Sequence, residues 1–296
     1  NLTNIIPILA VLALGAQRLL PLLQMIYGNL TVILGSTAGL EDVLKLLRKK
    51  EKTNFNIQKN KSFKFYKSIT IKNIFFRYKK NSQYVLKNID LKIKSGSRVG
   101  IIGETGSGKS TLLDVIAGLI KVDKGKIYID DVKLDHKNLK YWYNKISYVP
   151  QNIFLLDTSI KQNIALGVNK KEIDIERINF ALKVAQLDKL ISKHKKGYDL
   201  VVGEKGVRLS GGQRQRIGLA RAIYRKSSII LFDEATAALD NETEKEVIES
   251  INNISKDITT IMIAHRISSL RYCDEIIKLK EGKIDGIYKY EDIKKL

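Results

Sequence analysis

The apolar positions near the start of the chain predict a helix. Ile5 to Ala16 is an unbroken apolar stretch of twelve residues, with Pro7 and Gly15 as its potential irregularities. Because a bilayer span needs about 20 apolar residues, this stretch alone is half a membrane helix or a buried helix. Leu19 to Leu34 continues as an apolar helix with polar breaks.

An amphipathic segment follows. Its apolar residues keep the i, i+3, i+4, i+7 spacing of one helix face, at Leu40, Val43, Leu44 and Leu47. A basic cluster typical of the cytoplasmic side of a membrane comes next, at Lys45, Arg48, Lys49, Lys50 and Lys52. We therefore interpret residues 1–48 as the C-terminal end of a transmembrane domain, entered inside its last helix because the chain begins at Asn1 without methionine. A signal peptide would instead have a basic start and a small-residue cleavage site.

The rest of the pattern predicts a separate domain. Residues 49–67 are predicted to form a polar linker rich in Lys and Asn. The aromatic residues Phe63, Phe65 and Tyr66 near its end indicate that the first strand of the domain begins there. Residues 68–296 suffice for one sizeable core. Short apolar runs predict strands at 98–102, 229–232 and 259–264, and helical periodicity from Ile175 to Leu190 marks a helical insert over about 151–225.

A phosphate-binding motif follows the first of these strands. Residues 103–110 fit the pattern G-x-x-x-x-G-K-[ST]. The glycines let backbone N–H groups close around phosphates, and the start of the following helix adds a favourable dipole. Lys109 supplies a cation for the β- and γ-phosphates, and Ser110 is placed to ligate Mg²⁺. The residues assigned to the nucleotide here are Gly103, Glu104, Thr105, Gly106, Ser107, Gly108, Lys109, Ser110 and Thr111.

Two acids follow the strand at 229–232. Carboxyl ends of parallel strands are where such sheets bind ligands. We expect Asp233 to hold Mg²⁺ in its outer shell and Glu234 to polarise the water that attacks the γ-phosphate. A solvated helix cap is the alternative for any single acid after a strand, and the phosphate loop beside it argues against that alternative.

Between these motifs lies the run Leu209-Ser210-Gly211-Gly212-Gln213. With this run, the chain from about residue 68 to 285 resembles the ATP-binding cassette (ABC) family. The resemblance implies an α/β fold: a P-loop NTPase parallel-sheet core with an antiparallel β subdomain and a helical insert, preceded here by the end of a transmembrane helix. It also implies ATP and Mg²⁺ as cofactors and ATP hydrolysis as the activity.

The resemblance assigns further residues. Tyr78 matches the aromatic on which adenine stacks, and Gln151 matches the glutamine that reaches the metal and attacking water and links the site to the membrane part. Asp240 matches the loop that crosses to the partner subunit, although a helix N-cap explains it equally well. His265 matches the histidine that contacts the γ-phosphate, with a buried structural histidine as the plainer interpretation.

The signature run implies a partner. Ser210 and the backbone of Gly211 and Gly212 lead into a helix, so they present a hydroxyl, free N–H groups and a dipole to an anion. In the family that anion is the γ-phosphate on the opposite subunit. We therefore expect a homodimer, or a pair with a paralogous half-transporter, that sandwiches two ATP molecules. Residues 201–207 resemble an element of exporters, which implies a plasma or inner membrane location with the nucleotide-binding domain on the cytoplasmic side.

Composition changes little in this picture. The net charge is +21, from 52 basic and 31 acidic residues, but the lysines are scattered and no aromatic residues interleave with them to form a nucleic-acid platform. We therefore expect no nucleic acid partner. The lone Cys273 forbids an intrachain disulfide and shows no metal-ligand spacing.

Other readings remain open. A soluble cassette ATPase acting on ribosomes or DNA fits the charge but not residues 1–47, and a nucleotide-gated scaffold without turnover fits poorly with Glu234 and His265. For the cargo, residues 17–21 resemble exporters that flip lipid-linked oligosaccharides, while lipids, peptides and drugs are alternatives.

Overall fold

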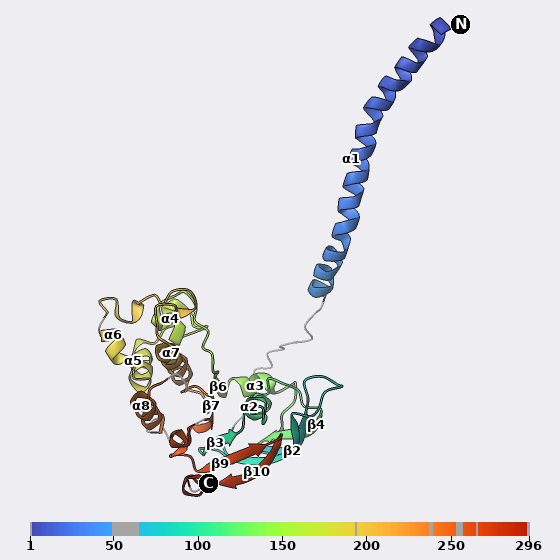
Figure 1. The fold of residues 1–296 in the computed structure, drawn as a ribbon. Coiled ribbons are helices and arrows are strands. Elements are labelled where there is room, and N and C mark those ends of the chain that lie inside the picture. Colours follow the sequence, from blue (N-terminus) through green and yellow to red (C-terminus); the bar gives the residue numbers. More distant parts are fainter. Residues whose placement is uncertain are drawn as a thin grey trace. The chain divides into compact units, whose positions relative to one another are not determined.

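The computed structural model describes residues 2–48, 65–192, 194–236, 239–252, 257–264 and 266–294. The chain divides into two units, Asn1–Lys61 and Ser62–Leu296. The first contains one long helix, and the second contains all the strands in the described part of the chain (Figure 1).

The helix of the first unit is α1 (Leu2–Arg48), with Pro7 and Pro21 inside it. Ile5–Arg48 is long and apolar enough to cross a membrane by length and composition, and no other helix in the described part of the chain meets that test. The apolar helix therefore continues past Arg18, as the pattern over Leu19 to Leu34 predicts. Gln17 and Arg18 interrupt the apolar run, but both residue types form helices well, so the helix continues through them.

The second unit contains two sheets. An antiparallel sheet has the order β2-β1-β4-β5, formed by β1 (Ser68–Phe76), β2 (Leu86–Lys94), β4 (Lys124–Ile129) and β5 (Val132–Lys133). A six-stranded sheet has the order β10-β9-β3-β8-β7-β6, formed by β3 (Arg98–Gly103), β6 (Ile146–Val149), β7 (Ile229–Asp233), β8 (Thr259–Ile263), β9 (Glu275–Lys280) and β10 (Lys283–Tyr288). Only β10 is antiparallel to its neighbour in this second sheet. The expected parallel core and antiparallel subdomain are both confirmed.

Helices cover the six-stranded sheet and extend from it (Figure 1). They are α2 (Lys109–Ala117), α3 (Leu139–Tyr143), α4 (Ile160–Ile164), α5 (Ile175–Val184), α6 (Asp188–Ser192), α7 (Gly211–Tyr224), α8 (Asn241–Asn252) and α9 (Tyr290–Ile293). Short 3₁₀ turns are η1 (Lys170–Glu172), η2 (Gly197–Asp199), η3 (Glu204–Gly206) and η4 (Ile267–Leu270). Helix α7 packs on α4 and α5.

The segment with helical periodicity from Ile175 to Leu190 forms two helices, α5 and α6. Gln186 lies between them with a φ of 55°. This left-handed conformation ends α5, since an α-helix of L-residues cannot continue through it.

Strand β7 contributes side chains to two hydrophobic cores, one on each face of the sheet. Ile229 and Leu231 pack in one core and Ile230 and Phe232 in the other, as the alternation of side chains along a strand requires. Burial on both faces explains the unbroken apolar run in the sequence. Trp142 is fully buried in the first core, and its indole N–H donates to the Ile116 carbonyl at 3.0 Å.

We predict that Ile261→Ala, in the central strand β8, lowers the free energy of unfolding by about 2–5 kcal/mol, because it empties a fully buried site. Ile287→Ala is the matched control, since this isoleucine is 51% exposed on the edge strand of the same sheet. Guanidinium unfolding followed by fluorescence of Trp142, the only tryptophan of the chain, measures both. Equal losses in the two variants would contradict the described core.

Candidate active site

The loop between β3 and α2 is shaped for a phosphate. Gly103 has a φ of 147°, and a Cβ added there would lie 2.2 Å from the Leu279 carbonyl oxygen, so only glycine fits. Gly106 has a φ of 84°, and a Cβ added to it would meet nothing within 4 Å. Glu104 and Thr105 are exposed beside it. One side of the loop is therefore packed against β9 and the other faces open space.

Two polar side chains of this loop fit a bound anion. Lys109 is buried, and its Nζ donates to the carbonyl oxygens of Gly103 and Glu104 at 2.9 Å each. The buried Ser107 Oγ has no hydrogen-bond partner among the described residues. An unsatisfied buried hydroxyl is uncommon in a folded protein. Its presence next to the charged Lys109 fits a loop built to hold phosphate oxygens.

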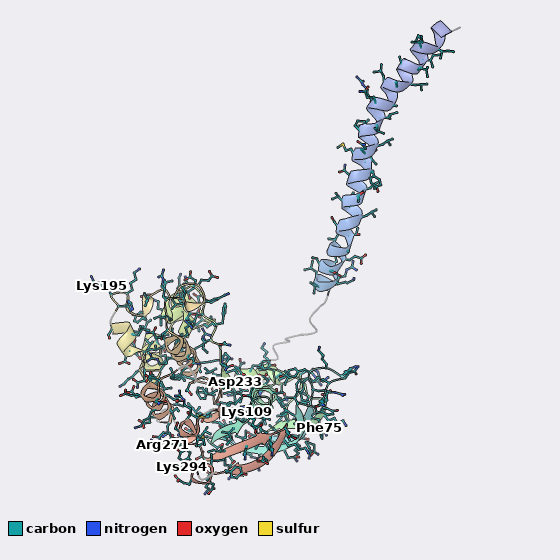
Figure 2. The ribbon with its side chains drawn as sticks, in the orientation of Figure 1. Phe75, Lys109, Lys195, Asp233, Arg271 and Lys294 are labelled. Carbon is teal, nitrogen blue, oxygen red and sulfur yellow. The ribbon has the colours of Figure 1, made fainter. Side chains whose placement is uncertain are left out.

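The metal-ligand candidates lie at the start of α2 and the end of β7. Ser110 Oγ donates to Asp233 Oδ1 at 3.0 Å, and Tyr148 Oη donates to Asp233 Oδ2 at 3.0 Å. Figure 2 shows Lys109 and Asp233 in this part of the second unit. A hydroxyl paired with a carboxylate is a donor set that suits Mg²⁺, which prefers oxygen ligands. The residues present therefore fit this ion.

Asp114 and Tyr148 also belong to this group around Asp233, although the sequence pattern did not single them out. Tyr148 Oη also lies 3.4 Å from Asp114 Oδ1. Burial, together with the nearby Asp233 charge, raises the pKa of Asp114, and burial beside both carboxylates raises the pKa of Tyr148. The signal for Asp114 was its place four residues after Ser110, which puts both on one face of α2. Nothing in the sequence pointed to Tyr148, because its partner Asp233 is 85 residues away in sequence.

The proposed hydrolytic residue already has a partner. Gln151 Nε2 donates to Glu234 Oε2 at 2.7 Å. Glu234 directly follows β7 with a φ of 51°, a left-handed conformation that is rare for residues other than glycine. Such strained positions cluster at functional sites. The turn brings this carboxylate next to Gln151, as the sequence analysis expected for two residues of one site.

Tyr78 lies in the loop after β1 and is 63% exposed. Its hydroxyl is 3.0 Å from Thr111 Oγ1, in the helix that follows the phosphate loop. Its ring meets Phe76 edge-on, with 5.0 Å between ring centroids. The side chain is therefore largely exposed, and the hydroxyl contact joins this loop to the phosphate-binding helix.

The run Leu209 to Gln213 forms the start of α7. Gln213 N donates to Ser210 Oγ at 3.2 Å, and Ser210 N donates to Gln213 Oε1 at 2.8 Å, which together make a capping box. Leu209 is buried and Ser210 is exposed. The first N–H groups of a helix have no intrahelical partner, so the N–H groups of Gly211 and Gly212 can serve an external anion.

Of the last two predicted residues, the structure describes Asp240 but not His265. Asp240 caps α8, since Thr243 N donates to Asp240 Oδ1 at 2.9 Å, and this bond from Thr243 lowers the pKa of Asp240. The cap anticipated in the sequence is therefore present. His265 lies outside the described residues. The structure thus brings together the phosphate loop, Tyr78, Asp233, Glu234 and Gln151, while Ser210 and Asp240 are exposed and bond within their own helix starts.

Comparisons with known proteins agree with this geometry. The family model described as ABC transporter matches residues 86–237, just over half of the chain. The alpha-hemolysin translocation ATP-binding protein HlyB of Escherichia coli is 40% identical over 225 residues, which are 76% of this chain and 32% of that protein. The leukotoxin translocation ATP-binding protein LktB of Mannheimia glucosida is 41% identical over 216 residues, 73% of this chain and 30% of that protein.

A solved structure is also similar. The structure of a bacterial Atm1-family ABC exporter with ATP bound has a TM-score of 0.73 and 32% sequence identity, and the match covers 77% of this chain and 40% of that chain. The chain spans about a third of the length of the curated relatives that it matches. From its motifs, its two sheets and these matches, we conclude that the chain belongs to the ABC transporter family and carries the nucleotide-binding ATPase domain of that family.

Proposed function

We propose that this chain binds and hydrolyses Mg-ATP and that hydrolysis powers export across a membrane. The observation that carries the proposal is the cluster at the carboxyl ends of β3 and β7, where Ser110 contacts Asp233 and Gln151 contacts Glu234. A phosphate loop alone would support binding. The added pair of acids, Asp233 beside the metal-ligand candidate Ser110 and Glu234 beside Gln151, supports turnover.

Phosphate binding would use Lys109, which now donates to backbone carbonyls of the loop, and the hydroxyl of Ser107, which is unpaired among the described residues. Lys109 would exchange the carbonyls of Gly103 and Glu104 for phosphate oxygens, and Ser107 would gain the partner that it lacks. Ser110, Asp233 and Gln151 would hold Mg²⁺, directly or through water. The ion would neutralise charge on the phosphates and orient them. Tyr78 would stack on the adenine ring.

Hydrolysis would use Glu234 as the base. Water attacks the γ-phosphorus, the bond from that phosphorus to the β,γ-bridging oxygen breaks, and ADP leaves with the bonding electrons. Glu234 accepts the proton of the attacking water. Gln151 now donates to the same carboxylate. This hydrogen bond must break, or the Gln151 side chain must move, before water can reach Glu234. His265 remains the predicted contact of the γ-phosphate.

A second copy of the chain, or a paralogous half-transporter, would complete each site. The exposed Ser210 and the N–H groups of Gly211 and Gly212 would donate to the γ-phosphate held by the opposite phosphate loop. Such donors stabilise charge that develops during phosphoryl transfer. The exposed Asp240 would lie at the same interface.

The membrane part of the proposal rests on α1 and on the relatives. Ile5–Arg48 is long and apolar enough to span a bilayer, and Lys45 and Arg48 lie in its last turn, as expected for a cytoplasmic end. This helix favours an exporter over a soluble cassette ATPase. The reported relatives give no support to a lipid-linked oligosaccharide cargo. Their names, which refer to translocation of alpha-hemolysin and leukotoxin, favour a polypeptide.

We predict that Lys109→Ala lowers the affinity for Mg-ATP by about tenfold or more, because it removes a buried cation from the phosphates. Lys137→Ala, a change at an exposed lysine in the loop before α3, should leave the affinity unchanged. Anisotropy of a fluorescent ATP analogue measures both. Equal affinity in the two variants would remove Lys109 from the site.

We predict that Glu234→Gln slows steady-state ATP hydrolysis by about 100-fold or more, since the base is lost while the shape is kept. Because the uncleaved nucleotide persists, light scattering on the detergent-solubilised chain should show a dimer that forms with Mg-ATP. Glu281→Gln is the matched control, because Glu281 is also left-handed, with a φ of 48°, but lies exposed in the turn between β9 and β10. Turnover of the Glu234 variant at the rate of this control would support a scaffold without hydrolysis.

We predict that Ser210→Arg, in a chain that also carries Glu234→Gln, keeps the affinity of the monomer for Mg-ATP but abolishes the nucleotide-dependent dimer. The arginine would occupy the space that the opposite γ-phosphate requires. Titration with the fluorescent analogue and light scattering separate the two effects. A dimer of unchanged stability would mean that Ser210 does not face the second nucleotide.

A further inference from the structure

Glu244 is a buried carboxylate to which the mechanism above gives no role. It lies in the first turn of α8 and is 5% exposed. Thr236 Oγ1 donates to its Oε1 at 2.6 Å, Ser269 Oγ donates to the same oxygen at 2.6 Å, and Arg266 Nη1 donates to Oε2 at 2.8 Å. One donor from the segment after β7 and two from the segment after β8 therefore converge on this side chain of α8, so that three segments meet at Glu244.

This arrangement is specific in chemistry. A buried carboxylate is stable only with charge-assisted hydrogen bonds to most of its lone pairs, and here both oxygens are used. An amide in its place would have one acceptor oxygen and an NH₂ group that faces donors. Glutamine therefore has nearly the same shape as Glu244 but loses either the bond from Arg266 or the bonds that the two hydroxyls donate.

The three segments lead to the residues expected to act in hydrolysis. Thr236 is two residues after Glu234, and Glu244 is four residues after Asp240 on the helix that Asp240 caps. Arg266 is the residue after His265 in the sequence, and its Nη1 also donates to Asn241 Oδ1 at 2.7 Å. Glu244 thus links the segment behind the proposed base to the helix behind the proposed dimer contact.

We propose that Glu244 is a positioning residue that couples the second copy's contact at Asp240 to the placement of Glu234. The inference rests on the proposed function. A shift of the α8 start on dimer contact moves the Glu244 carboxylate. Through the bonds to Thr236 and Arg266, the segments after β7 and β8 move with it. Glu244 touches no residue of the phosphate loop by these bonds, so nucleotide binding itself does not depend on it.

The test separates turnover from binding in the full 296-residue chain. For Glu244→Gln we expect kcat for ATP to fall by about tenfold or more, with the affinity for Mg-ATP within about threefold of the unchanged chain. Glu249→Gln is the matched control. Glu249 lies on the same helix and accepts from Tyr272 Oη at 3.1 Å. Its substitution therefore makes the same chemical change in a bond between α8 and the segment after β8, but at a bond that does not involve Thr236, Arg266 or Ser269. This control should keep both values.

Two milder variants cover the case in which Glu244→Gln fails to fold. Thr236→Val and Ser269→Ala each remove one donor and leave the ion pair with Arg266 in place. Each should lower kcat by about threefold or more with unchanged Mg-ATP affinity.

The outcomes are distinct. Normal kcat in Thr236→Val and Ser269→Ala, or a parallel loss of kcat and affinity in a folded Glu244→Gln, overturns the role of Glu244 while the proposed function stands. An unchanged chain that binds but does not hydrolyse ATP overturns the proposed function, and this inference with it.

Discussion

The alignment of three parallel strands is the constraint on which the site depends. Ile101 of β3 pairs with Ile263 of β8, and Ile263 pairs in turn with Asp233 of β7. Strands β7 and β8 therefore end at the same level of the sheet, and β3 continues beyond that level from Ile101 to Gly103. The phosphate loop follows β3, the acidic pair lies at the end of β7, and His265 comes two residues after the end of β8 in the sequence. A one-residue slip of any strand would turn its side chains to the other face.

This alignment also explains the mutual contacts of the polar groups. Lys109, Ser110 and Glu234 all bond to neighbouring protein atoms, at Gly103, Asp233 and Gln151. Such contacts hold the side chains close to the geometry in which they would act. Preorganised groups lose little freedom when a ligand arrives, which favours both binding and catalysis.

Hydrogen bonds to carboxylates connect the site to other elements of the unit. Tyr148 contacts Asp233 from β6, and Glu244 receives donors from segments after β7 and β8. Each contact crosses between elements, so it can form only after the sheet is complete. The hydrophobic cores on both faces of β7 supply that completeness.

The sequence alone predicted most of the site because its chemistry is local. The phosphate loop, the helix start after Ser210 and the acids after β7 each depend on residues within a few positions of one another, so their spacing identifies them. The parallel strands were equally plain, since burial on both faces demands continuous apolar runs. The roles of Tyr78, Gln151 and Asp240 came from the family resemblance.

Only the tertiary structure decided the contacts between distant segments. Tyr148 and Asp233 are 85 residues apart, and Glu244 and Ser269 are 25 apart, and no periodicity links such pairs. In the sequence, Glu244 is an ordinary acid in the first turn of a helix, where the helix dipole favours one. The break at Gln186 was likewise hidden, because one left-handed residue ends a helix that the apolar pattern alone would continue.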